Sequence, residues 1–216
     1  MKPDESVLEG IVTTINEDGS TNIAPMGPIV DVDMSTLRLR PYQTSTTYAN
    51  LKRTEQGIFH VTDDVFLIAR AAVNCLDPLP PLVDCRAVEG RILSDACRWY
   101  AFRVEVIDDR QERTDITARV VDRGRLRDFF GFNRAKHAVL EAAILATRIG
   151  FVPPDTISSQ LDQLAITVEK TAGERERQAF QFLEDYVHRQ ETVASGSTPA
   201  AVSRRTPKPV RQQPGC

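Results

Sequence analysis

Alternating hydrophobic and polar positions in the first 125 residues predict short strands. The clearest period-two pattern lies in two neighbouring segments, 97–107 and 115–122, which the charged loop 108–112 joins as a hairpin. Other β-branched or alternating segments predict strands over residues 7–15, 21–25, 34–40, 57–62 and 87–93. Six or seven short strands separated by turns are typical of a small barrel.

Two short helices are expected between the strands, and the pattern turns helical after Gly131. One begins at Ser45 or Thr46 and continues through Lys52; the other follows the capping run 62–64 and covers 65–71. Helical spacing then predicts a helix over 133–149 with Gly150 as its C-cap, and Pro153 and Pro154 break the chain. Two further helices, starting at Asp155 or Ser159 and after Thr171, are expected to form a hairpin laid on the barrel.

The pattern therefore predicts an α+β chain that is mainly β. We expect a barrel over residues 1–130, a helical extension packed on it over 131–190, and a disordered basic tail over 191–216.

Composition and charge narrow the function classes. With 41% hydrophobic and 26% charged residues in 216, the chain has the make-up of an ordinary soluble protein. The net charge is −3, but the segment from Glu191 onward carries +3, so the first 190 residues carry −6. This balance argues against nucleic-acid binding by the body of the protein. No apolar run is long enough for a membrane span, and the acidic N-terminus favours the cytoplasm over secretion.

Two segments in the first third of the chain carry candidate binding chemistry. A strand ending in Ala24, Pro25, Met26 and Gly27 offers a sparsely paired backbone edge to a flat polar heterocycle, unless it is a plain strand terminus. The hydroxyl run precedes a short helix whose free N–H groups favour anions, and it comprises Thr44, Ser45, Thr46 and Thr47. Arg40 and Lys52 supply positive charge, which predicts a phosphate cradle; the alternative is a run that only caps the helix.

The third segment opens the long helix after Gly131. Asn133, Arg134 and Lys136 lie in its first turn, where cations oppose the helix dipole. Either a bound anionic or carbonyl-rich ligand or a salt bridge to the acidic body would offset that cost. No metal site is expected, because neither the histidines nor the cysteines have ligand spacing. No GxSxG, HExxH or P-loop pattern is present, so no catalytic residue is assigned.

These same three segments resemble the family known as domain of unknown function 447. The resemblance rests on Ile-Ala-Pro-Met-Gly-Pro at 23–28, Arg-Pro-Tyr-x-Thr-Ser-x-Thr-Tyr-x-Asn-Leu at 40–51, and Gly-Phe-Asn-Arg-Ala-Lys-His at 131–137. It implies an FMN-binding split barrel related to flavin reductases, a homodimer with FMN at the subunit interface, and a link to pterin-dependent one-carbon metabolism. The tail after residue 190 lies outside the resemblance.

The resemblance also suggests roles for single residues. The hydroxyl run 44–47 should meet the FMN phosphate, with Asn50 close by and Arg40 as the main cation. The backbone of 24–27 should flank the isoalloxazine ring. Lys136 and Arg134 are expected at the N1–C2=O edge of the ring or at the second subunit's phosphate, where positive charge stabilises reduced anionic flavin.

Two functions remain open at this point. The first is an FMN-dependent oxidoreductase that moves hydride from a reduced nicotinamide or similar donor to a small acceptor such as a pterin or a free flavin. The second is a non-catalytic flavin carrier or interaction module, motivated by the lack of an acid or base residue and by the appended helices.

Overall fold

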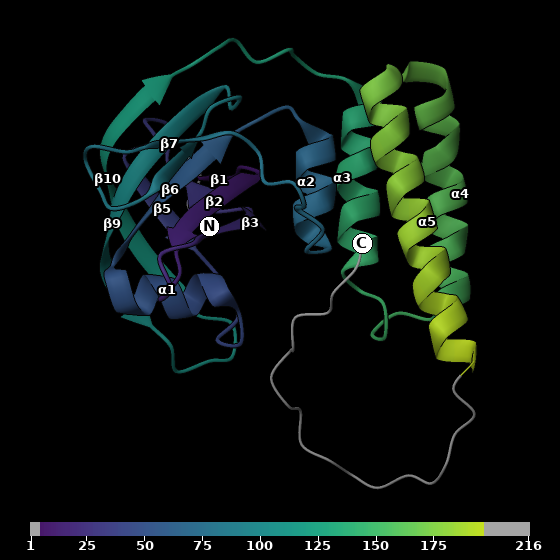
Figure 1. Ribbon diagram of the computed structural model, residues 1–216, viewed down its shortest axis with the longest axis horizontal. Helices are drawn as coiled ribbons and strands as arrows, with labels where there is room; N and C mark the ends of the chain where they lie inside the picture. The colour runs from purple at the N-terminus through teal and green to yellow at the C-terminus, as the bar shows by residue number, and fades with distance from the viewer. Residues whose placement is uncertain (1–4, 197–216) are drawn as a thin grey trace, which may run out of the picture. The chain divides into compact units, whose positions relative to one another are not determined.

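The computed structural model describes residues 5–196 of the chain, and these residues form two compact units. Unit 1 combines the residues up to Asp64 with Pro78–Gly131, and unit 2 combines Val65–Asp77 with the residues from Phe132 onward. Figure 1 labels α1 and most of the strands that make up unit 1, and the four helices of unit 2.

Unit 1 is built on one eight-stranded antiparallel sheet with the order β1-β4-β5-β10-β9-β6-β2-β3. A separate two-stranded sheet pairs β7 with β8, and one helix, α1, follows β5. The elements of the unit are β1 (Ser6–Val7), β2 (Gly10–Ile15), β3 (Thr21–Met26), β4 (Ile29–Val30), β5 (Thr36–Leu39), α1 (Thr46–Thr54), β6 (Gln56–Val61), β7 (Leu82–Asp84), β8 (Arg91–Leu93), β9 (Arg98–Asp108) and β10 (Asp115–Arg125).

The expected hairpin of segments 97–107 and 115–122 is present, and β2 and β3 form another. β2 and β3 pair along their whole length around a turn in which Gly19 adopts φ 81°. β9 and β10 form the long hairpin, with register shifts between Thr117 and Ala118 and between Val120 and Asp122. Alternation places Phe59, Phe102 and Leu37 inside, where they form a fully buried core. Burial of such side chains supplies about 2 kcal/mol each toward folding.

The core of the sheet also contains a buried histidine. Nδ1 of His60 lies 3.3 Å from the Ile11 carbonyl oxygen, and its Nε2 accepts a hydrogen bond of 3.1 Å from the Leu93 N–H. The ring is therefore neutral with its proton on Nδ1. Burial lowers the pKa of His60 to about 4, even though the contact with the Ile11 carbonyl acts in the opposite direction. His60 is a structural residue that joins β6 to β2 and β8.

Unit 2 is helical. It contains α2 (Val65–Ala72), α3 (Arg134–Ala146), α4 (Pro154–Thr171) and α5 (Glu174–Gly196). In Figure 1, α3, α4 and α5 lie side by side. The alanines of α3 allow its neighbours to approach closely, and they share a core with Val65, Phe180 and Leu183. Larger apolar side chains of α2 and α5 therefore pack against the alanine face of α3.

Several element boundaries differ from the expectation. α2 lies within the first 130 residues, yet Val65, Ala69 and Val73 belong to the core of unit 2 and not to that of the sheet. α3 ends with Thr147 as its C-cap instead of Gly150. α4 starts at Pro154, because proline fits the first helical position, where no N–H partner is needed.

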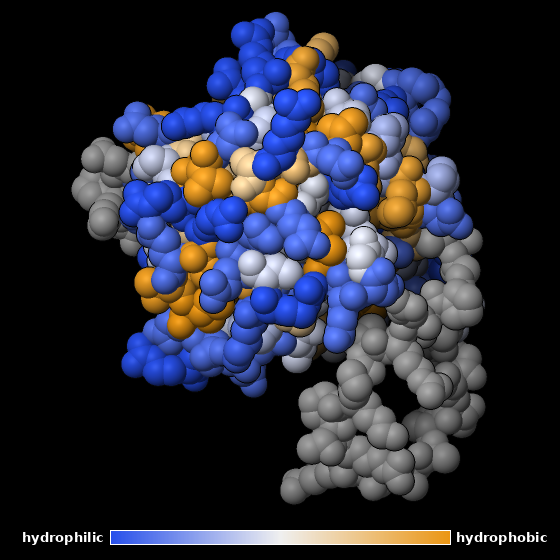
Figure 2. Space-filling model, turned by 60° about the vertical axis from the view of Figure 1, so that its left-hand side comes forward, coloured by the Kyte–Doolittle hydropathy of each residue, from blue (hydrophilic) through white to orange (hydrophobic). Residues whose placement is uncertain are grey.

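The last helix is longer than expected. α5 continues to Gly196, so residues 191–196 belong to a helix and not to the tail. The remaining part of the expected tail, 197–216, lies outside the described residues. Among residues 5–196, no helix is long and apolar enough to cross a membrane. The face of the molecule in Figure 2 shows hydrophobic residues only as small separate patches among hydrophilic ones.

Candidate functional site

The amino end of α1 has free hydrogen-bond donors. Ser45 is the N-cap: its Oγ accepts a hydrogen bond of 3.2 Å from the Tyr48 N–H and donates one of 2.7 Å to the Tyr42 carbonyl. Within residues 5–196, no acceptor pairs with the backbone N–H groups of Thr44, Thr46 and Thr47. Such unpaired groups at the positive end of a helix dipole bind anions.

The hydroxyl run divides into inward and outward residues. Thr47 is 3% exposed, and its Oγ1 accepts a hydrogen bond of 3.1 Å from Asn22 Nδ2 on β3. Thr44 and Thr46 are exposed, and no hydroxyl partner occurs for either in the described part of the chain. Ser45 is held by the helix itself. The two threonines on either side of Ser45 are therefore the hydroxyls open to a ligand.

Asn50 is part of a buried polar seam. Its Nδ2 donates to Thr14 Oγ1 at 3.0 Å and to Asn16 Oδ1 at 2.8 Å. Asn22 Nδ2 donates to the same threonine oxygen at 3.1 Å. Because an unmet polar group inside a protein is costly, this closed network fixes α1 against β2 and β3.

The cations near α1 have different surroundings. Arg40 is exposed, and no residue of the described chain bonds to its guanidinium. Arg113, on the loop between β9 and β10, donates from Nε to the Arg40 carbonyl oxygen at 3.2 Å, and its guanidinium lies 5.7 Å from the Tyr42 ring centre. Arg113 and Tyr42 are the residues that the sequence analysis did not select. The only sequence signal for Arg113 is the predicted hairpin of segments 97–107 and 115–122, because its loop brings the chain back to Arg40.

Lys52 is already engaged by a carboxylate. Its Nζ lies 2.8 Å from Asp109 Oδ2 and 3.0 Å from the Tyr48 hydroxyl, which itself donates to Asp109 at 2.7 Å. The hydrogen bond to Asp109 and then that to Tyr48 raise the pKa of Lys52, and the same contacts lower the pKa of Asp109. Lys52 also lies six residues from the first residue of α1, which is about 9 Å along the helix axis.

The Pro-Met-Gly segment ends an edge strand. Ala24, Pro25 and Met26 close β3, which pairs only with β2 in the described sheet, and all three are half-buried. Proline is tolerated at such an edge because no partner strand needs its N–H. A Cβ added at Gly27 would lie 2.8 Å from Glu9 Oε1 and 2.9 Å from Val7 Cγ1, so the backbone here runs close to its neighbours. Asn22 joins this strand directly to α1.

The third motif belongs to unit 2. Asn133 is the N-cap of α3, accepts from the Lys136 N–H at 3.1 Å and donates from Nδ2 to the Thr171 carbonyl at 3.1 Å. Lys136 Nζ lies 2.9 Å from Glu176 Oε1, and the two side chains are only 16% and 11% exposed. Burial alone would raise the pKa of Glu176, but the hydrogen bond and charge of Lys136 outweigh it and lower that pKa. Arg134 is exposed, and within the described ranges nothing pairs with it.

No metal centre is visible in the described chain: residues 5–196 contain no cluster of three metal-ligating side chains. Asp63 accepts hydrogen bonds from Arg127 Nη2 at 2.5 Å and from the Phe130 N–H at 2.7 Å. His60 is held by backbone groups, as described above.

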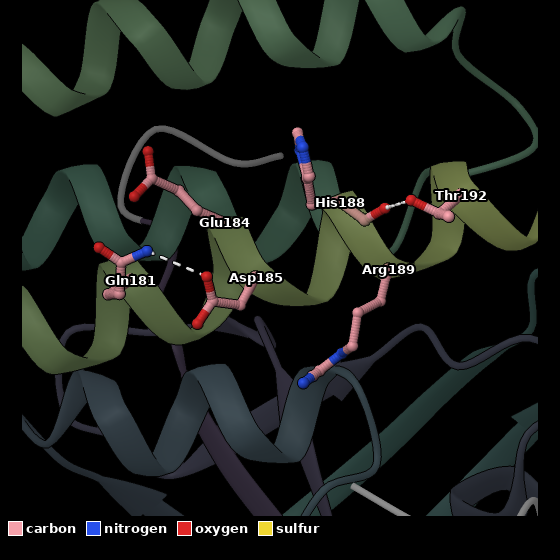
Figure 3. A pocket seen from close by; sticks show the side chains of 6 residues that line it. All are labelled: Gln181, Glu184, Asp185, His188, Arg189 and Thr192. Carbon is pink, nitrogen blue, oxygen red and sulfur yellow. Dashed lines mark hydrogen bonds between the residues drawn. The ribbon is translucent and has the colours of Figure 1, made fainter.

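A shallow hollow lies on α5. Figure 3 shows its lining: Gln181, Glu184, Asp185, His188, Arg189 and Thr192. Burial, and then the charges of Asp185 and Asp162, raise the pKa of Glu184. This surface is unfavourable for a phosphate, and it contains no residue of the three motifs.

Family models match both parts of the chain. The N-terminal domain model of a protein of unknown function, DUF447, matches residues 8–127, and the DUF447 C-terminal model matches residues 133–185. The chain belongs to the DUF447 family. The resemblance inferred from the three motifs is therefore confirmed. A comparison with the curated proteins finds no match.

One solved structure shows the fold over most of the chain. An FMN-bound DUF447 protein from Methanosarcina mazei is 20% identical, with a TM-score of 0.72 over 84% of this chain and 95% of its own. This confirms the α+β split-barrel fold with a helical extension. The 2-nitrobenzoate 2-nitroreductase NbaA of Pseudomonas fluorescens is 16% identical, with a TM-score of 0.46 over 58% of this chain and 66% of its own. An FMN-binding protein from Thermus thermophilus is 12% identical, with a TM-score of 0.47 over 55% of this chain and 70% of its own.

Proposed function

We propose that this DUF447 protein binds FMN with its phosphate at the amino end of α1. One observation carries the proposal: the exposed guanidinium of Arg40 has no partner within the described chain, and α1, which begins six residues later, has three unpaired N–H groups at its amino end. The FMN bound to the family relative from Methanosarcina mazei supports the choice of cofactor.

The residues present fit a mononucleotide. Thr44 and Thr46 offer free hydroxyls, and Arg40 and Arg113 offer guanidiniums that can grip a phosphate with two bonds each. β3 leads from Asn22, at the α1 seam, to the backbone of 24–27, which we assign to the ring. In this arrangement the buried Thr47 and Asn50 support the site from its inner side, and Lys52 supports it from the outer side through Asp109.

We further propose that the protein is an FMN-dependent oxidoreductase and a homodimer in the cytoplasm. Bound FMN would supply hydride transfer, here from a reduced nicotinamide or similar donor to a small acceptor such as a pterin. The chain's own part is to hold the phosphate, align the ring along the β3 edge and shield it from water. Arg134 remains our proposal for the ring edge or the second subunit's phosphate.

The test is a visible spectrum of the purified protein followed by titration with FMN. We expect the bands of bound flavin, or saturable quenching of FMN fluorescence in the apoprotein. Arg86→Ala is a matched control for the arginine variants, because Arg86 is exposed and has no partner in the described residues. A colourless protein that takes up no FMN would refute the proposal.

One observation favours a non-catalytic flavin module as the second candidate. Two carboxylates at the carboxyl end of β9 and in the loop after it are paired, Asp108 with Arg110 and Asp109 with Lys52, and His60 is buried and neutral. Steady oxidation of NADH or NADPH with a defined acceptor would exclude this candidate. Bound FMN without turnover by any donor would favour it.

A further inference from the structure

Three side chains from distant parts of the sequence form a clasp on the outer side of α1. They are Tyr48 and Lys52, one turn apart on the helix, and Asp109 from the loop between β9 and β10. Tyr48 is 8% exposed, and its hydroxyl donates a hydrogen bond to Asp109. A single carboxylate thus holds two successive turns of the helix.

Other bonds tie the cradle to the same loop. Gln43 Nε2 donates to the carbonyl oxygens of Asp109 at 2.6 Å and Gln111 at 2.9 Å, and the Gln43 N–H donates to the Glu112 carbonyl at 2.9 Å. Thr114 Oγ1 donates to the Pro41 carbonyl at 2.8 Å. The segment that precedes α1 is therefore fastened along the loop that also carries Arg113.

α1 is consequently fixed on two sides. The seam of Asn50 and Thr47 holds its inner side to β2 and β3, and the clasp holds its outer side to the hairpin loop. The free N–H groups at its amino end can only converge on one anion if the helix axis does not swing. A ligand site needs such support because a displacement of an ångström weakens its hydrogen bonds.

We propose that Asp109 is a positioning residue for phosphate binding. Lys52 then forms its ion pair with Asp109 and does not contact the ligand. The choice of FMN phosphate as the ligand rests on the proposed function, whereas the contacts of Asp109 do not depend on it. Asp109 is itself an anion near the cradle. Coulomb's law alone therefore predicts that removing its charge strengthens phosphate binding, whereas positioning predicts that binding weakens.

Asp109→Asn separates the two explanations, with Asp108→Asn as the matched control. Asp108 is the preceding residue, at the end of β9, and among residues 5–196 its carboxylate bonds only to Arg110. We expect Asp109→Asn to weaken binding of FMN and of inorganic phosphate about tenfold, while riboflavin affinity stays within about twofold of the wild type. Asp108→Asn should change neither.

Tyr48→Phe is a second variant that alters no charge. It removes one hydrogen bond of the clasp and keeps the aromatic ring in place. We expect a loss of about threefold to fivefold in phosphate and FMN affinity, which cannot arise from a Coulomb effect. This variant also decides the matter if Asp109→Asn does not fold.

Several outcomes would overturn the inference. Tighter phosphate binding by Asp109→Asn would show that the released Lys52 is a ligand cation. Equal losses for FMN and riboflavin would show a general structural role, and unchanged affinities would show that the clasp is dispensable. If the wild type binds phosphate but not FMN, the proposed function fails while the phosphate titrations still test Asp109. If FMN binds and the variants match the wild type, only this inference fails. A wild type that binds neither would end both.

Discussion

Two helices of this protein begin in the same way, yet their amino ends have different surroundings. α1 is capped by Ser45 and follows Arg40, and α3 is capped by Asn133 and carries Lys136. At α1 the cation is exposed and has no partner among the described residues, whereas at α3 the lysine is 16% exposed and paired with Glu176. A cation near a helix start thus indicates a ligand only when no distant carboxylate reaches it.

The amide groups show the same contrast. The Asn133 side chain spans from its own helix to the Thr171 carbonyl at the end of α4, so it joins three helix ends together with Lys136 and Glu176. The amino end of α1 has no such closure, since Thr44 and Thr46 remain open. We therefore regard the amino end of α1 as the phosphate site, and Asn133 and Lys136 of α3 as an internal joint of unit 2. Arg134, which is exposed in the same turn of α3, stays a separate proposal.

Lys136→Met tests the α3 side of this comparison, and it should give the largest change in the free energy of unfolding. The change leaves the Glu176 carboxylate, 11% exposed, without its cation, and breaking such a pair costs about 3–4 kcal/mol of the free energy of unfolding. Denaturant unfolding measures it, with Lys170→Met as the control, because Lys170 is exposed in the last turn of α4. If stability is unchanged and FMN affinity falls, α3 is a ligand site after all.

Acidification should destabilise unit 1 at a higher pH than unit 2. His60 has a pKa of about 4 in the folded protein against 6.5 for a free histidine. Between these values the unfolded chain binds a proton that the folded chain does not, so the stabilisation is complete above pH 6.5 and is lost as the pH falls toward 4. The expected loss in unit 1 is about 3 kcal/mol.

The pair of Lys136 and Glu176 responds at lower pH. Glu176 has a pKa below its ordinary 4.5, so its contribution is present above 4.5 and is lost only below that value. The fluorescence of Trp99, the single tryptophan of the chain, reports on β9 in unit 1, and amide hydrogen exchange reports on α3. His60→Gln should remove the loss between pH 6.5 and 4; the same loss in that variant would contradict the assignment.

Local patterns predicted much of the fold. Most strands, the start of α1 at Ser45 or Thr46 and the family itself could be read from alternation, turn residues and three motifs, whereas β4 and β7 lie outside the predicted strands. The place of α2 could not, because its apolar face fits either core, and only the alanines of α3 decide between them. The end of α5 was placed too early, since polar composition does not prevent a helix.

The sequence predicted the parts of the site that residues close together in the chain form, but not the contacts between distant residues. The hydroxyl run was found, but which hydroxyls face inward depends on Asn22 of β3, and the partner of Lys52 is Asp109, 57 residues away. Arg113 was missed because it meets Arg40 across 73 residues. The ring contacts of residues 24–27 and the role of Arg134 stay predictions.

Arg40→Ala tests the ligand side of the comparison. Loss of a charged contact to phosphate is worth about 2 kcal/mol, so the Kd for FMN should rise by about thirtyfold. Stability should not change, because the exposed guanidinium has no partner in the described structure. Arg86→Ala is the control, and an unchanged Kd would show that Arg40 does not meet the phosphate.

Ser45→Asp tests the same point without removing a cation. Aspartate is a good N-cap, so α1 should keep its stability, but its charge would lie where we place the phosphate. We expect FMN binding to weaken by about tenfold. Asn133→Asp makes the same change at α3 and should leave the Kd for FMN unaltered; equal effects at both helices would break the distinction between them.

The smallest expected effects come from removing the two caps. Ser45→Ala loses the acceptor for the Tyr48 N–H and should cost about 1 kcal/mol. Asn133→Ala also leaves the Thr171 carbonyl without its donor and should cost somewhat more, about 1.5 kcal/mol. Ser45→Thr and Asn133→Ser keep a cap oxygen and should recover most of the loss at α1 but only part of it at α3. Because the α3 cap joins two helices and the α1 cap serves one, equal recovery at the two positions would argue against α3 as a joint.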